Sequence, residues 1–110
     1  MVFDVIISRY AQEQLREYGS YLMYEKMNSQ AADALMDDVI QTQHRLLNVA
    51  ASLSYLKDRD LRMLGYKKIR LKKHRSLFIF RIQNDVAYID AMYHELQDYE
   101  NLFKEEVLWK

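Results

Sequence analysis

The chain has 110 residues, a formal net charge of zero, 50% hydrophobic residues and no cysteine. This length fits a single domain over residues 1–110, and the lack of cysteine excludes disulfides and thiolate metal sites. The N-terminus lacks the basic start of a signal peptide, and no stretch approaches the ~20 apolar residues that span a bilayer. We therefore expect one cytoplasmic domain that stays out of the membrane.

The zero net charge hides an uneven distribution of charged residues. Residues 55–81 hold ten Lys and Arg but only two Asp and Glu, and the rest of the chain is acidic by the same margin. A basic segment on a neutral protein can still create a local positive field of several kT. Residues 55–81 are therefore a candidate surface for an anionic partner such as nucleic acid.

The first half of the chain predicts a strand followed by two helices. Residues 2–8 are rich in β-branched side chains and predict the strand. Apolar side chains recur at helical spacing over residues 9–26 and again over residues 29–48. The connection between these helices is very short, so we expect an antiparallel pair. Candidate N-caps are Ser8 for the first helix and Asn28 or Ser29 for the second.

Residues 49–65 show no clear period and are expected to form a loop. From Tyr66 the period changes to two, because basic side chains alternate with Ile69 and Leu71 up to residue 72. This alternation predicts a half-buried strand with a basic outer face. The pair Lys73-His74 is expected to turn the chain.

The remaining residues predict two strands and a helix. Residues 75–83 are apolar on both faces, as expected of a central strand, and residues 86–93 form the last strand. Between them, Asn84-Asp85 predicts a tight turn. A terminal helix is expected over about residues 98–109.

The predicted order is β-α-α-β-β-β-α, which is typical of an α+β fold. We expect the N-terminal strand and a two-helix hairpin to pack on an antiparallel sheet. Strands joined by short turns should form a meander, and the sheet face away from the hairpin should stay partly open.

Four segments carry a resemblance to a known family. They are VIISRYA at residues 5–11, GYKKIRL at 65–71, HRSLF at 74–78 and YHELQDY at 93–99. In this order, with an Asn-Asp hairpin before the last, they resemble the RelE/ParE superfamily of toxins from type II toxin–antitoxin systems. The resemblance covers nearly the whole chain.

The resemblance implies one of two activities, and the shared fold does not decide between them. RelE-like members cleave mRNA in the ribosomal A site without a metal or cofactor, whereas ParE-like members poison DNA gyrase. It also implies a cognate antitoxin that binds through a helix or an extended strand. Because this antitoxin would match the charge of residues 55–81, we expect it to be acidic.

Metal-free RNA cleavage needs a base for the 2′-OH, cations for the phosphorane and an acid for the leaving 5′-oxygen. The resemblance implies that Arg75, at the start of the central strand, binds the phosphate through its planar guanidinium. Arg81 has the same strand parity and could extend this catalytic patch. The predicted RNA-binding residues are Lys68, Arg70, Lys72 and Lys73.

His94 matches the catalytic histidine near the chain end of YoeB-like members. Because imidazole exchanges protons near neutral pH, it could act as acid or base. YoeB-like members follow this histidine with tyrosine, whereas this chain has Glu95. The acid role then falls to Tyr93, Glu95 or Tyr99, and Asp58 or Asp60 is a candidate for the family's carboxylate.

These residues also have a structural interpretation, since a Lys/Arg strand face is commonly solvated surface and a histidine after a strand is commonly a capping residue. The first hypothesis is a ribosome-dependent mRNA endonuclease that uses the basic sheet face and a histidine. The second is a gyrase inhibitor without nuclease chemistry. The third is an interaction protein that has lost toxicity.

Overall fold

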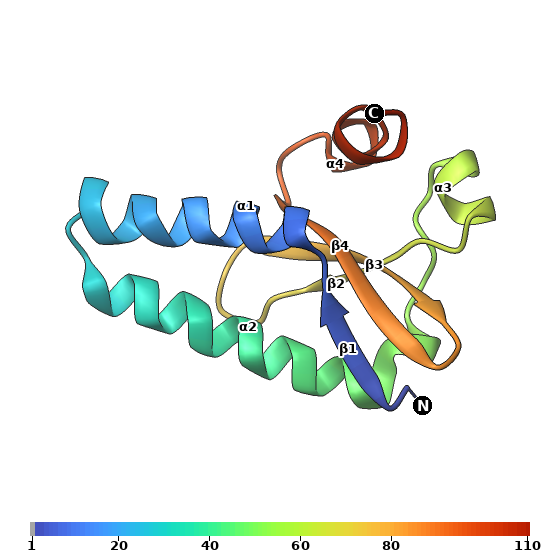
Figure 1. Ribbon diagram of the computed structural model, residues 1–110, viewed down its shortest axis with the longest axis horizontal. Coiled ribbons are helices and arrows are strands. Elements are labelled where there is room, and N and C mark those ends of the chain that lie inside the picture. Colours follow the sequence, from blue (N-terminus) through green and yellow to red (C-terminus); the bar gives the residue numbers. More distant parts are fainter. Residues whose placement is uncertain (1) are drawn as a thin grey trace.

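The structure is a computed structural model that describes residues 2–110. Strand β1 (Asp4–Ile7) leads into helix α1 (Arg9–Ser20), which continues through a π-helical turn (Tyr21–Glu25). Helix α2 (Ser29–Val49) then returns beside α1, as Figure 1 shows. After a 3-10 turn (Ala50–Ser52) come helix α3 (Arg59–Met63) and strands β2 (Lys67–Arg70), β3 (Ser76–Gln83) and β4 (Val86–His94). The chain ends with helix α4 (Tyr99–Phe103) and a second π-helical turn (Lys104–Leu108).

The helical hairpin begins at the residues that the sequence indicates. Ser8 Oγ accepts a hydrogen bond from the backbone N–H of Ala11 at 3.1 Å, which caps α1. Asn28 Oδ1 accepts from the N–H of Ala31 at 2.9 Å. Asn28 is therefore the cap of α2, and the alternative cap Ser29 is its first helical residue.

The prediction of a loop over residues 49–65 is wrong in two places, the 3-10 turn and helix α3. Asp58 caps α3 through Oδ1, which accepts from the N–H groups of Asp60 and Leu61 at 3.0 and 3.1 Å. Leu61 is fully buried and fixes the helix to the core. Five residues are too few to display a helical period, so this helix left no pattern in the sequence.

The four strands form one sheet in the order β1-β4-β3-β2. As predicted, β2, β3 and β4 form an antiparallel meander, and Asn84 and Asp85 turn the chain with φ of 53° and 63°. Strand β1, however, pairs with β4 in parallel, so the sheet is mixed rather than antiparallel throughout. Parallel neighbours require a long crossover, and the chain between β1 and β4 supplies it.

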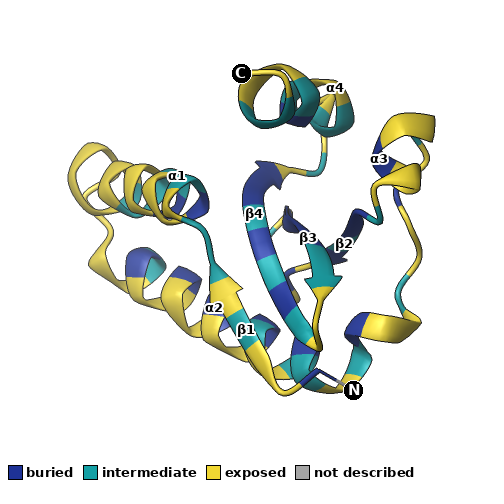
Figure 2. Ribbon diagram, turned by 45° about the vertical axis from the view of Figure 1, so that its right-hand side comes forward, coloured by how far each residue is buried: buried dark blue, intermediate teal, exposed yellow. Residues whose placement is uncertain are grey.

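The two faces of the sheet pack against different helices, because successive strand side chains point to opposite sides. Phe78 and Phe80 of β3 join the core cluster that α1 and α2 cover. Leu77 and Ile79 of the same strand join a second cluster, which includes Phe103 of α4. Strand β3 is thus buried on both faces over most of its length, as expected of a central strand (Figure 2).

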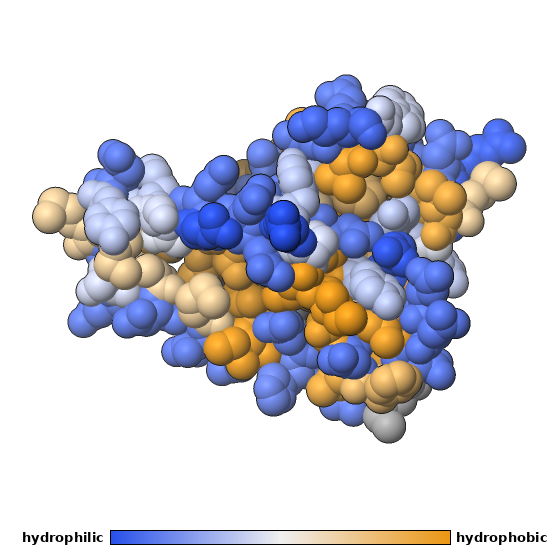
Figure 3. Space-filling model, viewed as in Figure 1, coloured by the Kyte–Doolittle hydropathy of each residue, from blue (hydrophilic) through white to orange (hydrophobic). Residues whose placement is uncertain are grey.

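Some apolar side chains reach the surface. In Figure 3 they gather between α1 and β1 and again beneath α4. Phe3 and Ile6, beside and within β1, are among the exposed large hydrophobic residues. Within residues 2–110, no helix combines the length and the apolar character needed to cross a membrane.

Candidate functional site

A group of charged and polar side chains lies on the α4 side of the sheet, where β2, β3 and β4 meet the turn regions. Lys68 and Arg70 come from β2 and, two residues apart, share one face. Arg75 precedes β3, Glu95 follows β4, and Tyr99 is the first residue of α4. We call these five residues the basic cluster.

Glu95 bridges the two arginines of the basic cluster. Arg75 Nε lies 2.6 Å from Glu95 Oε1, and Arg70 Nη1 lies 3.3 Å from Oε2. The Glu95 side chain is 16% exposed, whereas the arginine side chains are 64% and 67% exposed. The hydrogen bond from Arg75, with the added charges of Arg70, Arg75 and His94, holds the pKa of Glu95 below its ordinary value against the opposing effect of burial. The cluster therefore presents two solvent-facing guanidinium groups around one ionised carboxylate.

Lys68 and Tyr99 form the second contact of the basic cluster. Lys68 Nζ lies 2.6 Å from Tyr99 Oη and 5.2 Å from the centre of its ring. An ammonium group can only donate, so the tyrosine oxygen accepts this bond. The hydroxyl proton of Tyr99 is therefore left to donate to another group.

His94, predicted to act beside Arg75, extends from the other face. In the register, His94 pairs with Ser76, one position from Arg75, and the backbone N–H of Glu95 donates to the Arg75 carbonyl at 2.8 Å. Adjacent residues of a strand point to opposite sides. His94 Nδ1 accepts from the N–H of Leu96 at 3.1 Å, so a neutral ring carries its proton on Nε2. The imidazole is thus near enough for its charge to help lower the pKa of Glu95, but its ring nitrogen bonds to the Leu96 backbone and not to the basic cluster.

Arg81 lies on the same face as Arg75 but towards the opposite end of β3. Its Nε is 3.1 Å from Asp90 Oδ2, its Nη1 is 2.6 Å from Gln83 Oε1, and its guanidinium stacks 4.7 Å from the ring centre of Tyr88. Burial raises the pKa of Asp90, and the charge of Arg81 counteracts this rise. Arg81 therefore compensates a partly buried carboxylate, away from the basic cluster.

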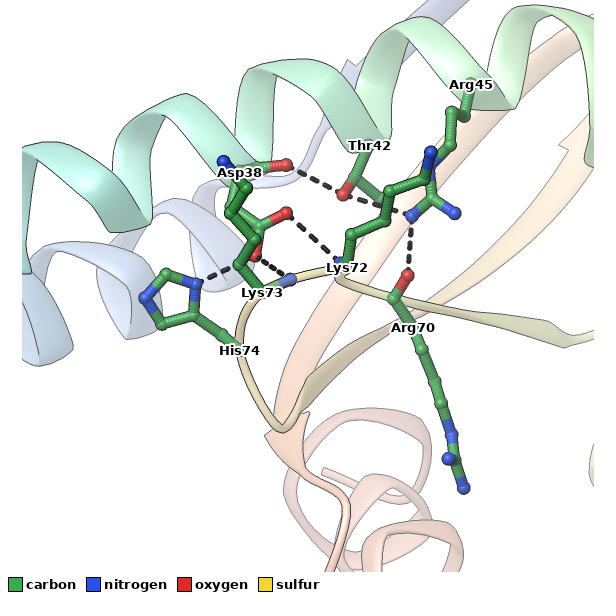
Figure 4. A network of polar contacts seen from close by, with 7 residues as sticks. All are labelled: Asp38, Thr42, Arg45, Arg70, Lys72, Lys73 and His74. Atoms are coloured by element: carbon green, nitrogen blue, oxygen red, sulfur yellow. Dashed lines mark hydrogen bonds and ion pairs between the residues drawn. The ribbon is translucent and has the colours of Figure 1, made fainter.

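Lys72 and Lys73 lie in the turn between β2 and β3, because β2 ends at Arg70 and not at residue 72 as expected. Their side chains are exposed, but their backbone N–H groups donate to Asp38 of α2, at 3.1 Å to Oδ1 and 2.8 Å to Oδ2. His74 Nδ1 lies 2.8 Å from Asp38 Oδ2 (Figure 4). The 2%-exposed Asp38 thus holds the whole turn against α2.

Sequence reasoning missed Asp38, although a signal was present. An acidic residue stands there within the apolar stripe of α2, one helical turn from the buried Leu35 and Thr42. Burial would raise the pKa of Asp38, but the hydrogen bond from His74 and the two backbone N–H donors outweigh it and lower the pKa. Such a buried, satisfied carboxylate is a structural anchor.

Helix α2 makes one more contact with this region. Arg45 Nη2 donates to the backbone carbonyl of Arg70 at 2.6 Å, while the Arg70 side chain points away from α2 (Figure 4). Side chains of helix α2 therefore form hydrogen bonds with the turn at Arg70 and at residues 72–74. These bonds hold in place the backbone from which the side chains of Arg70 and Arg75 extend.

Helix α4, which carries Tyr99, is tied to the segment before α3. Glu100 Oε1 accepts from the N–H of Asp58 at 2.6 Å, and Lys104 Nζ lies 2.5 Å from Asp58 Oδ2. The hydrogen bond from Lys104 is the main reason that the pKa of Asp58 is lowered. Asp58, a candidate for the family's carboxylate, is therefore engaged as a helix cap and as an anchor of α4.

Tyr93, another candidate acid, is held in the second core cluster. Its hydroxyl donates to Glu106 Oε1 at 3.0 Å. Burial, followed by the contact with Glu106, raises the pKa of Tyr93 far above its ordinary value. Of the two candidate tyrosines, Tyr99 is the one placed in the basic cluster.

The comparisons with known proteins agree with this architecture. No family model matches the sequence, and no curated protein matches it. The α+β arrangement, with its helical hairpin and mixed sheet, is shared with a solved structure from a toxin–antitoxin system. One of the structures with a similar fold is a chain of "Chromosomal ParDE TA system from P. aeruginosa", with a TM-score of 0.65 and 16% sequence identity. It covers 84% of this chain and 96% of that chain.

Proposed function

We propose that this chain is the toxin of a type II toxin–antitoxin pair and that it cleaves mRNA in the cytoplasm through the basic cluster. The observation that carries this proposal is the meeting of three cations, one carboxylate and one tyrosine hydroxyl on a single sheet face. These groups suit the three tasks of metal-free RNA cleavage.

In the proposed reaction, a phosphate of the RNA binds to the guanidinium groups of Arg70 and Arg75. Glu95 takes the proton of the neighbouring 2′-OH, and this oxygen attacks the phosphorus. The bond from phosphorus to the 5′-oxygen breaks, and Tyr99 gives its proton to that oxygen. The products are a 2′,3′-cyclic phosphate and a 5′-hydroxyl end, and Lys68 stabilises the phenolate left on Tyr99.

Glu95 is a weak base while both arginines hold it, because its pKa is lowered by the hydrogen bond from Arg75. A bound phosphate would draw these guanidinium groups to itself. The pKa of Glu95 would then rise, which improves its match to a proton transfer near neutral pH. Binding of the RNA phosphate would in this way also make Glu95 a stronger base.

The other predicted site residues have different places in this proposal. Lys72 and Lys73 contact RNA phosphates from the exposed turn beside Arg75 and make no contribution to the chemistry. Arg81 keeps its structural partner Asp90. His94 is outside the reaction, because its ring belongs to the opposite face.

The proposal includes a cognate antitoxin and the ribosome as partners. The similar ParDE structure is, by its title, from a toxin–antitoxin system. An acidic antitoxin segment laid over the basic cluster would compete with mRNA for Arg70 and Arg75. This competition would account for neutralisation of the toxin.

The test is induced expression of the chain with mapping of transcript ends. Wild type should generate new 5′-hydroxyl ends within translated mRNA, and Arg75→Ala should abolish them. Arg62→Ala is the matched control, because it removes the same charge from an exposed position of the same basic segment. If folded Arg75→Ala produced the same ends as wild type, the nuclease assignment would fail.

The second candidate function is inhibition of DNA gyrase, the activity that the resemblance to ParE-like toxins implies. An inhibitor of this kind needs no acid or base. Its marker is double-strand DNA breaks in expressing cells while mRNA stays intact, and the same cultures used for transcript-end mapping can supply this measurement.

A further inference from the structure

A pocket lies on the other side of the strand ends that carry the basic cluster. Its volume is about 340 Å³, at the lower end of the range for small-molecule sites, about 300–1,000 Å³. It opens between helix α1 and the ends of β3 and β4. The lining residues are Gln14, Glu17, Tyr18, Ser76, Met92, Tyr93, His94 and Gln97.

The pocket combines an apolar wall with hydrogen-bonding groups. Tyr18, which packs against the first core cluster, and Met92 contribute an aromatic ring and a thioether. Glu17 contributes an exposed carboxylate, which can only accept hydrogen bonds when ionised. An aromatic wall beside polar groups suits a flat ligand that stacks and hydrogen-bonds at its edge.

The backbone fixes which atoms of the two glutamines remain for a ligand. The N–H of Met92 donates to Gln14 Oε1 at 2.7 Å, and the N–H of His94 donates to Gln97 Oε1 at 2.8 Å. A backbone N–H can only face an acceptor, so these contacts identify the oxygens. Each Nε2 is left to donate, and so is Nε2–H of His94. Glu17 is therefore a double acceptor and these three groups are donors, while the hydroxyl groups of Ser76 and Tyr18 can donate or accept.

Two residues that line the pocket are sequence neighbours of residues in the basic cluster. Ser76 and His94, which line it, are bonded directly to Arg75 and Glu95. Ser76 and His94 are the last pair of the β3–β4 ladder, and Arg75 and Glu95 follow directly beyond it. A single-stranded RNA that passes around these strand ends can place a phosphate on the arginines and the neighbouring base on the pocket side.

We propose that this pocket binds a guanine base of the RNA substrate, next to the phosphate held by Arg70 and Arg75. The inference rests on the proposed nuclease function and names the base that this function would prefer. His94 then has a role, which is to recognise the base and not to move a proton in the reaction.

Guanine is the RNA base whose edge matches this set of groups. Its N1–H and N2–H₂ are neighbouring donors that a carboxylate accepts together, as Glu17 can do. Its O6 and N7 are acceptors for the free amide donors and for His94 Nε2–H. Adenine, cytosine and uracil each lack a pair of neighbouring donor groups, so they leave Glu17 partly unpaired. These bases therefore make fewer hydrogen bonds to Glu17 than guanine does.

A binding experiment tests the pocket apart from cleavage. The four ribonucleoside 5′-monophosphates are titrated into the purified full chain, and backbone amide signals are followed by NMR. GMP should shift the signals of Met92 and His94 and bind about tenfold to a hundredfold more tightly than the other nucleotides. Glu17→Gln should lose this preference. Glu13→Gln, an exposed carboxylate change on the same helix outside the pocket lining, should keep it.

Cleavage mapping separates this inference from the proposed function. If both hold, wild-type cut sites share a guanine at one position, and Glu17→Gln cuts without that preference. Cuts with no base preference in wild type would overturn the pocket assignment and leave the nuclease intact. Guanine-selective binding without any cuts would support the pocket and remove the nuclease. Equal binding of all four nucleotides, or shifts away from the pocket, would also overturn the inference.

Discussion

Arg75 and Glu95 are joined twice across the ends of β3 and β4. The backbone N–H of Glu95 donates to the Arg75 carbonyl at 2.8 Å, and the Arg75 guanidinium donates to the Glu95 carboxylate at 2.6 Å. The backbone hydrogen bond brings the two side chains together. Arg75 therefore already has an anionic partner before any RNA binds. Any phosphate that binds here must compete with this carboxylate.

Replacement of Glu95 should have opposite effects on RNA binding and on RNA cleavage. Glu95→Gln removes the competing negative charge, so RNA binding should tighten. The same change removes the proposed base, so single-turnover cleavage should fall by about 10²–10⁴-fold. Filter binding and cleavage of one RNA measure both quantities. Glu105→Gln, an exposed change in the C-terminal turn, is the control, and unchanged cleavage by Glu95→Gln would exclude the base role.

Removal of one hydroxyl tests the proposed acid. Tyr99→Phe keeps the ring near Lys68 but removes the oxygen that Lys68 contacts, so cleavage should fall by about 10²–10⁴-fold with RNA binding preserved. Tyr55→Phe, a change at another tyrosine whose ring lies beside a lysine, should leave cleavage unchanged. The idea does not survive if the two variants cut equally fast.

The buried anchor of the β2–β3 turn should matter for stability. Asp38→Ala leaves the N–H groups of Lys72 and Lys73 and the ring of His74 without their acceptor. We expect a loss of about 3–5 kcal/mol in the free energy of unfolding, as for other broken buried pairs. Urea denaturation measures this loss. The neighbouring exposed change Asp37→Ala should cost far less, and similar values for both would contradict the anchor.

The carboxylate of Asp38 should also make the stability of the fold depend on pH. The pKa of Asp38 is lowered in the folded chain, so its contribution is complete above the unfolded value of about 3.9. It is lost as the pH falls through the folded pKa. Denaturation midpoints should therefore decline below about pH 4. In Asp38→Asn this decline should be shallower, and an unchanged slope would show that the carboxylate does not titrate with unfolding.

Helix α4 should behave as part of the core. Phe103 is fully buried and packs edge-on against Tyr66, with ring centres 4.9 Å apart. Phe103→Ala should cost about 3–5 kcal/mol of unfolding free energy, measured by chemical denaturation. Trp109→Ala, at a 65%-exposed side chain, is the control. A small effect of Phe103→Ala would indicate a helix that detaches easily, as expected if a partner displaces it.

The sequence by itself determined much of the local structure, although not helix α3. The caps Ser8 and Asn28, the alternation before Arg70 and the turn at Asn84-Asp85 depend on residues close together in the chain, and all were found where expected. Local hydrogen bonds and side-chain periodicity are enough to specify such features. The placement of Arg70 and Lys68 on one face follows from the same periodicity.

The tertiary structure decided which site residues meet. Ile79 pairs with Ala91 but Phe80 pairs with Ile89, so Asp90 is an extra residue in β4. Such a bulge reverses the side-chain alternation beyond it. The buried Ile89 faces the helical hairpin. If the side chains of β4 alternated regularly from Ile89 onward, Glu95 would also face the hairpin, and His94 would lie beside Arg75. With the bulge, Glu95 joins Arg75 and His94 lines the pocket, because strand register depends on pairing between distant segments that no local pattern encodes.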